Sequence, residues 1–198
     1  MSGKKIMGCR KGRSNQKGFT LIELMIAIAI IGAAVVTVLI YQGKAQSANR
    51  VTDTTTALTA MTSKIQQYFA NNSDGYTSLS ASNVINMGIV TQPFRVSGTD
   101  ILDAWGSTVN MSGSTQGFAL TLGGLATSPL SREECISLAT KLAAGAKIVQ
   151  VGTGLTTASG AISGTGKVYK ASDGTISMTN LLDNAGCGAT NPVVALQF

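Results

Sequence analysis

Histidine is absent from this 198-residue sequence, and charged residues make up only 12% of it. Without histidine, and without a second nearby pair of cysteines, the chain lacks the usual ligands of a zinc site. It also lacks the commonest general base of enzymes. The low charge is atypical of cytosolic enzymes, whereas the 44% hydrophobic content is too high for a disordered chain. The sequence therefore argues against catalysis, a bound metal or a cofactor.

Acidic residues are also missing from the first part of the chain, where positive charge is concentrated. The chain has 15 basic and 9 acidic residues, and six of the basic ones precede Phe19, so the chain from Phe19 onward has a formal charge of zero. These six residues are Lys4, Lys5, Arg10, Lys11, Arg13 and Lys17. The net charge of +6 thus belongs to the N-terminal peptide, and it gives little support to nucleic-acid binding.

A long apolar segment follows this basic peptide. Residues 19–41 can span a bilayer core of about 30 Å as one helix. Basic residues on the N-terminal side favour a cytoplasmic location for that side, which would place residues 42–198 in the periplasm or outside the cell. The alternative is a cleaved secretory signal peptide, whose apolar core would be shorter. Within the segment, Glu23 is costly in hydrocarbon. It lies either at the membrane interface without a partner or in a functional role with one.

The helix is expected to continue beyond the membrane, to about Ala70. No proline occurs in residues 42–69, and apolar residues recur there at steps of three, four and seven, as one face of a helix requires. The face comprises Val51, Leu58, Met61, Ile65, Tyr68 and Phe69. The polar, glycine-containing residues 71–75 then predict the end of the helix. One side of this second half therefore needs a domain to pack against.

The remaining sequence predicts that domain as an α+β head with a mainly antiparallel sheet, because helical and strand segments mix without a βαβ alternation. Ser131 and Glu134 have the spacing of a capping box and predict the start of a helix. Residues 152–166, rich in glycine, serine and threonine, are expected to form a flexible loop. The other predictions are short helices within 79–88 and 179–185, a helix over 132–144, hairpins of 107–111 with 118–122 and of 167–171 with 175–178, and strands over 147–151 and 193–197.

Cys135 and Cys187 are suited to a disulfide if the head reaches an oxidising compartment, although two buried free thiols are the alternative. Cys9, in the basic peptide, is interpreted as incidental. Among other candidate residues, Asp103 is interpreted as a turn cap and Trp105 as part of the core. The glycine-containing segments near residues 152 and 164 lack the spacing of a phosphate-binding loop.

The stretch Lys17-Gly18-Phe19-Thr20-Leu21-Ile22-Glu23-Leu24 resembles the processing site of type IV prepilins. That resemblance implies cleavage between Gly18 and Phe19 by a prepilin peptidase, N-methylation of Phe19, and a role for Glu23 in assembly. It implies the type IV pilin fold, with a long N-terminal helix packed on an antiparallel sheet. The three parts of the chain would be a cleaved basic leader (1–18), a transmembrane and filament-core half-helix (19–41) and the head (42–198).

Within the family, the long leader and the large region bounded by cysteines resemble the type IVb class. Phe19 departs from that class, and Ile40 occupies the position of the family's common helix-kinking proline. Cleavage would create a positive α-amine four residues before Glu23, and the amine of a newly added subunit could pair with Glu23 of its neighbour in a filament.

The resemblance implies a structural subunit of a type IV pilus without enzymatic activity. It would wait in the inner membrane as a single-pass protein with a cytoplasmic N-terminus, and assembly machinery would then build it into an extracellular helical homopolymer. The pilus would serve adhesion, aggregation or cell–cell contact, with a host or neighbouring-cell surface as its partner. The alternatives are a minor pilin or a type II secretion pseudopilin and, third, a membrane-anchored periplasmic enzyme or receptor.

Overall fold

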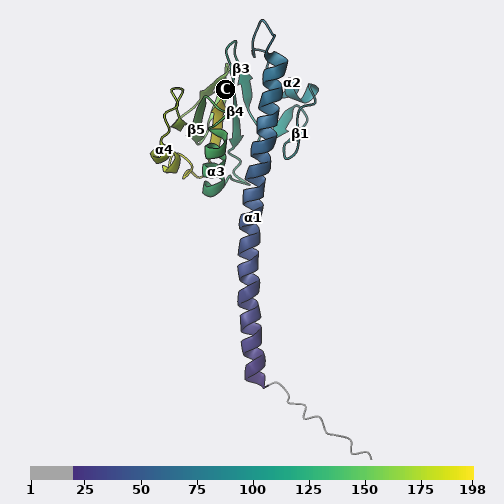
Figure 1. Cartoon of the computed structure of the whole chain (residues 1–198), viewed down its shortest axis with the longest axis vertical. Helices are drawn as coiled ribbons and strands as arrows, with labels where there is room; N and C mark the ends of the chain where they lie inside the picture. Colours follow the sequence, from purple (N-terminus) through teal and green to yellow (C-terminus); the bar gives the residue numbers. More distant parts are fainter. Residues whose placement is uncertain (1–19) are drawn as a thin grey trace, which may run out of the picture. The chain divides into compact units, whose positions relative to one another are not determined.

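The computed structural model describes residues 20–198 and divides the chain into two units, Met1–Gly43 and Lys44–Phe198. Helix α1 (Leu21–Phe69) contributes to both units (Figure 1). Its continuity follows from the sequence, which has no proline in this range. Threonine hydroxyls along the helix donate to the carbonyl four residues earlier, as Thr37 does to Ala33 at 2.9 Å. The predicted long helix, ending near Ala70, is confirmed.

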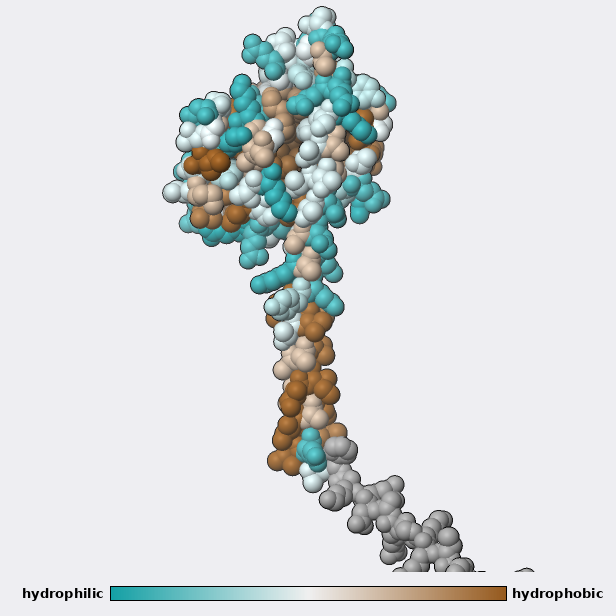
Figure 2. Space-filling model, in the orientation of Figure 1, coloured by the Kyte–Doolittle hydropathy of each residue, from teal (hydrophilic) through white to brown (hydrophobic). Residues whose placement is uncertain are grey.

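The two halves of α1 differ in their surroundings. No residue in the apolar window of the first half is buried, although its mean hydropathy is 2.7. Figure 2 shows this half covered by brown, hydrophobic atoms. In the second half, one side of the helix is buried in the head, with residues at the predicted helical spacing, except that Tyr68, predicted on this face, is 59% exposed. These buried residues are Val51, Thr54, Ala57, Leu58, Met61, Thr62, Ile65 and Phe69.

The head, Lys44–Phe198, is built on a five-stranded antiparallel sheet in the order β3-β4-β9-β5-β8. The strands are β3 (Met111–Gly113), β4 (Phe118–Gly123), β5 (Ile148–Gly152), β8 (Gly166–Lys170) and β9 (Val193–Gln197). Apolar residues of β4, β5 and β9 form one buried cluster with the second half of α1. This packing covers the apolar side of the helix, and the predicted α+β fold with an antiparallel sheet is confirmed.

Three shorter helices accompany the sheet: α2 (Ala81–Asn86), α3 (Arg132–Leu142) and α4 (Met178–Leu182). Each begins after a serine whose hydroxyl accepts a hydrogen bond from a backbone N–H in the first turn. At α3 the cap is reciprocal. Ser131 Oγ accepts from Glu134 N at 3.2 Å, and the Glu134 carboxylate accepts from Ser131 N at 3.0 Å. The predicted capping box is therefore confirmed.

The prediction of a flexible loop over residues 152–166 is wrong. This segment contains the hairpin of β6 (Thr156–Ala158) and β7 (Ala161–Ser163). Ser159 and Gly160 form its turn, both with positive φ (49° and 74°), as a tight two-residue hairpin turn requires. Leu155 is buried in a small cluster with Val193 and Ala195 of β9, against which Ile162 packs, so the hairpin is anchored to the sheet.

Two predicted strands are also displaced. The strand that precedes β4 in its hairpin, β3, begins at Met111 rather than at residue 107. Ser107 is held elsewhere, because its N–H donates to the Asp103 carboxylate at 2.8 Å. A further hairpin, β1 (Arg95–Ser97) with β2 (Asp100–Leu102), was not predicted. After β8, the partner strand predicted over residues 175–178 is reduced to a single bridge between Lys170 and Ile176. Ser177 caps α4 there instead.

Candidate functional site

The N-terminal turn of α1 carries the first candidate residues. The Thr20 carbonyl accepts hydrogen bonds from Glu23 N at 3.0 Å and Leu24 N at 3.2 Å, and Thr20 Oγ1 lies 3.4 Å from Glu23 N. Thr20 thus caps the helix, and Glu23 is an exposed acid of the first turn. A carboxylate at this end of a helix interacts favourably with the helix dipole. Gly18 and Phe19, the predicted cleavage and methylation positions, lie outside the described residues.

An exposed apolar surface surrounds Glu23. Large side chains over Leu21 to Tyr41 are each more than half exposed. They are Leu21, Ile22, Leu24, Met25, Ile26, Ile28, Ile30, Ile31, Val35, Val36, Val38, Leu39, Ile40 and Tyr41. Glu23 is the only charged residue in this range. A surface of this size is stable only in lipid or against other apolar helices.

The second candidate feature is the disulfide between Cys135 and Cys187, which confirms the predicted pairing. The two Cα atoms are 5.6 Å apart, and both residues are buried. Cys135 lies in the first turn of α3, and Cys187 follows α4, so the bond closes a segment that contains β5 to β8 and α4.

Polar contacts reinforce this disulfide-bounded region. Arg132 donates to the Leu182 carbonyl at 2.6 Å, and Lys167 lies 3.9 Å from Asp183. Lys170 Nζ, on β8, donates to the carbonyls of Ala143 at 2.6 Å and Ala146 at 2.7 Å. Ala143 is the C-cap of α3, where backbone acceptors lack helical partners, and Ala146 lies in the connection from α3 to β5.

A buried polar network connects three parts of the head. The Asp103 carboxylate accepts from the backbone N–H groups of Trp105, Ser107 and Gly123 at 2.7–3.0 Å. Burial nevertheless raises the pKa of Asp103 above its ordinary value, and these hydrogen bonds only partly offset it. Asp103 caps a turn, as predicted, and also joins that turn to the end of β4.

Trp105 is buried, as predicted, but its partner was not anticipated. Its indole N–H donates to Glu134 Oε2 at 3.2 Å. Burial acts to raise the pKa of Glu134, but hydrogen bonds from Ser131, Trp105 and Ser47 outweigh burial and hold that pKa below its usual value. The capping-box spacing identified Glu134 as a helix cap, but its contact with residues distant in sequence has no local signal.

Residues 20–198 hold no group of three or more histidine, cysteine, aspartate or glutamate side chains placed to bind a metal ion. The features that this part of the chain offers are an exposed apolar helix with one carboxylate and a head held by a disulfide. Such a combination serves association through the helix.

Comparison with known proteins places these features in a family. A model of the prokaryotic N-terminal methylation motif matches residues 13–39, and a model described as PilS N terminal matches residues 47–191. Among solved structures, TcpA, a type IV pilin from Vibrio cholerae El Tor biotype, is 17% identical, with a TM-score of 0.47. That match covers 75% of this chain and 98% of TcpA. Among curated proteins there is no match. Because the PilS model spans well over half of the sequence and the methylation motif precedes it, the chain belongs to the PilS family and is a type IV pilin.

Proposed function

We propose that this pilin is the main structural subunit of a type IVb pilus, which polymerises through residues 19–41. The observation that carries the proposal is the first half of α1. Its apolar residues are exposed, and one carboxylate, Glu23, lies among them in the first turn of the helix. In a filament, packing against the same helix of other copies would replace lipid around these side chains. Because lipid is as apolar as the helix, van der Waals packing and the polar pair should determine where subunits dock.

Before assembly, the subunit is a single-pass protein of the inner membrane. The six basic residues of the leader (1–18) keep the N-terminus in the cytoplasm. The helix over 19–41 spans the bilayer, and the head (42–198) lies outside the cytoplasm, where the disulfide forms. Prepilin peptidase cuts after Gly18 on the cytoplasmic side and methylates Phe19.

Cleavage supplies a charge that Glu23 requires. It creates an α-amine at Phe19, four residues before the carboxylate, and the cation of an incoming subunit pairs with Glu23 of its neighbour in the filament. Removing one partner from a buried ion pair costs about 3–5 kcal/mol, because the other charge stays buried alone. The pair therefore sets the register in which helices dock.

Purified filaments provide the test. If this chain is the main subunit, it forms the dominant band of sheared pili, and mass spectrometry finds an N-terminal peptide that begins with methylated Phe19. An N-terminus at Met1 in assembled material would overturn the processing proposal. Correct processing with only trace amounts in filaments would indicate a minor pilin or pseudopilin.

For the biological use of the filament, we propose adhesion, aggregation or contact between cells, because the polymer would present many copies of the head to a host or neighbouring cell. Deletion of the gene should then reduce cell aggregation or attachment, and expression of the unaltered chain should restore it. Wild-type attachment and aggregation in a strain without filaments would contradict this use.

A further inference from the structure

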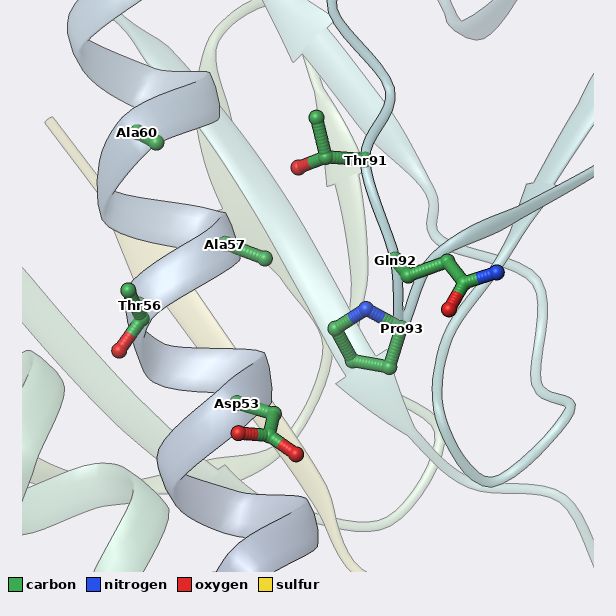
Figure 3. Close-up of a pocket in the computed structure, with 7 residues that line it drawn as sticks. All are labelled: Asp53, Thr56, Ala57, Ala60, Thr91, Gln92 and Pro93. Carbon is green, nitrogen blue, oxygen red and sulfur yellow. The ribbon is translucent and has the colours of Figure 1, made fainter.

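A groove runs along the head part of α1, between the helix and residues 91–95. It consists of two adjoining cavities of about 430 and 450 Å³ that share Asp53, Gln92 and Pro93. Figure 3 shows the first cavity, with Asp53 and Ala57 of the helix on the side that faces Pro93. We call these two cavities together the α1 groove.

The two ends of the α1 groove differ in chemistry. One end carries Arg50 and Arg95 with the amides of Gln46 and Asn49, and the other is lined by small residues that include Ala57 and Ala60. Within residues 20–198, neither arginine lies within salt-bridge distance of an acid, although Asp53 shares the groove. The α1 groove therefore has a formal charge of +1, and its exposed guanidinium groups are suited to bind a carboxylate.

A protrusion with matching chemistry lies in the disulfide-bounded region. Ile176, Met178 and Leu182 are 54%, 49% and 45% exposed, although they are apolar. Asp173, in the turn that precedes them, is exposed, and its Oδ1 accepts a hydrogen bond from Thr175 N at 2.9 Å. We call these four residues the α4 knob. Figure 2 shows hydrophobic atoms on the side of the head where Figure 1 places α4.

The α4 knob and the α1 groove lie on different sides of the head. In Figure 1, α4 is at one edge of the head and β1, which begins at the groove residue Arg95, is at the opposite edge. One copy cannot join its own two surfaces, but it can present the knob to the groove of the next copy. A contact between two different surfaces of identical chains propagates as a helix when the rotation does not close a ring.

We propose that the α4 knob of one subunit docks in the α1 groove of its neighbour in the filament. Asp173 faces Arg50 and Arg95, and the apolar side chains of the knob cover Ala57, Ala60 and Pro93. The proposal rests on the proposed function as a homopolymer. It adds a contact between heads to the contact between helices, and it identifies the two surfaces that meet.

Charge reversal tests the pairing in cells that assemble the full chain. Arg95→Glu and Asp173→Lys should each lower the yield of sheared filaments about tenfold or more, because each variant places like charges together. The double variant Arg95→Glu with Asp173→Lys restores opposite charges and should return the yield to within about twofold of wild type. Lys64→Glu on the same helix and Asp74→Lys serve as matched controls, and neither should change the yield.

Cross-linking in assembled filaments tests the contact directly. Arg95→Cys combined with Asp173→Cys should produce a ladder of covalent multimers on a non-reducing gel, and either single variant should remain monomeric. Normal filament yield in both single reversals would overturn the proposal. It would also fail if Arg95→Glu lowers the yield and the double variant does not recover, since the groove would then receive a different partner. Absence of wild-type filaments would instead contradict the proposed function itself.

Discussion

The indole N–H of Trp105 donates to Glu134 Oε2 at 3.2 Å, across 29 residues of sequence. Glu134 also caps α3 through Ser131, so one carboxylate fixes both the start of a helix and the position of the single tryptophan. This shared acceptor holds the turn that contains Trp105 against the start of α3.

Replacement of Glu134 by alanine should therefore destabilise the head. The buried donor Trp105 Nε1 would lose its acceptor, which costs about 1–3 kcal/mol for a buried group, and the part-buried Ser131 N would lose its cap. Denaturant unfolding of the full-length chain in detergent, followed by tryptophan fluorescence, measures this change. Glu133→Ala is the matched control, because Glu133 is an exposed acid in the same turn. Equal stability of the two variants would contradict the role assigned to Glu134.

Asp103 should give stability a distinctive pH dependence. Its pKa in the folded chain lies above the ordinary value of 3.8, so near that pH the folded state binds more protons than the unfolded state. The stability that Asp103 contributes is thus fully present below pH 3.8 and is lost as pH rises through the raised pKa. The free energy of unfolding of wild type minus that of Asp103→Asn should fall as pH rises from about 3 to 6.

Glu134 provides a comparison of opposite sign for this measurement. Its pKa is lowered from 4.5, so its contribution is present above that pH and is lost as pH falls through the lowered pKa. The same difference measured with Glu134→Gln should accordingly shrink on acidification. A flat difference for Asp103→Asn across the range would contradict the assigned pKa direction.

Local patterns predicted those elements of the head whose causes are local. The capping box at Ser131 and the apolar spacing along α1 depend on neighbouring residues, and both are confirmed. The start of β3 at Met111 was mispredicted because Asp103 holds Ser107 by a tertiary contact that no local pattern contains. The hairpin at Ser159 was missed for a different reason. Its glycine and serine content resembled a flexible segment, although Ser-Gly is also a turn signal, and Leu155 and Ile162 anchor it.

The features of the candidate site likewise fall into those that the sequence predicted and those that depend on tertiary structure. Glu23 and the cysteines were identified from the sequence, because one acid in an apolar run and two late cysteines are conspicuous by composition. The α1 groove could not be predicted, since it needs residues 91–95 to fold beside the helix. The partner of Trp105 required the same knowledge of tertiary structure.

Lys170 should be important for the end of α3. Its Nζ bonds two carbonyls there, and hydrogen bonds to a charged group contribute about 1.5–3 kcal/mol. Lys170→Met keeps the apolar stem and removes the charge, and it should lower the free energy of unfolding by an amount in this range. Lys167→Met, which removes only a surface pair at 3.9 Å, should change stability by less than about 1 kcal/mol. Similar effects of the two variants would contradict the capping role.

Loss of the disulfide should lower the stability of the head and the amount of pilus. The double variant Cys135→Ser with Cys187→Ser removes the covalent link between two residues that are 52 positions apart in the sequence. Removal of a native disulfide typically lowers the free energy of unfolding by about 2–5 kcal/mol. Thermal unfolding with and without reductant measures the effect in the wild-type chain. Cys9→Ser serves as a control, because the proposed cleavage removes Cys9 with the leader. Unfolding of wild type that is insensitive to reductant would show that the bond adds no stability.

Glu23→Ala separates processing from assembly. The variant keeps the apolar helix, so it should enter the membrane, and its leader should be cleaved as in wild type. Its filament yield should nevertheless drop by about 100-fold or more, since an α-amine buried without a partner costs about 3–5 kcal/mol at each docking step. Glu23→Asp, which keeps the charge, should recover part of the yield, whereas Glu23→Gln should not. If Glu23→Ala forms filaments at the wild-type level, the helices find their register by apolar packing alone, and the carboxylate has no role in docking.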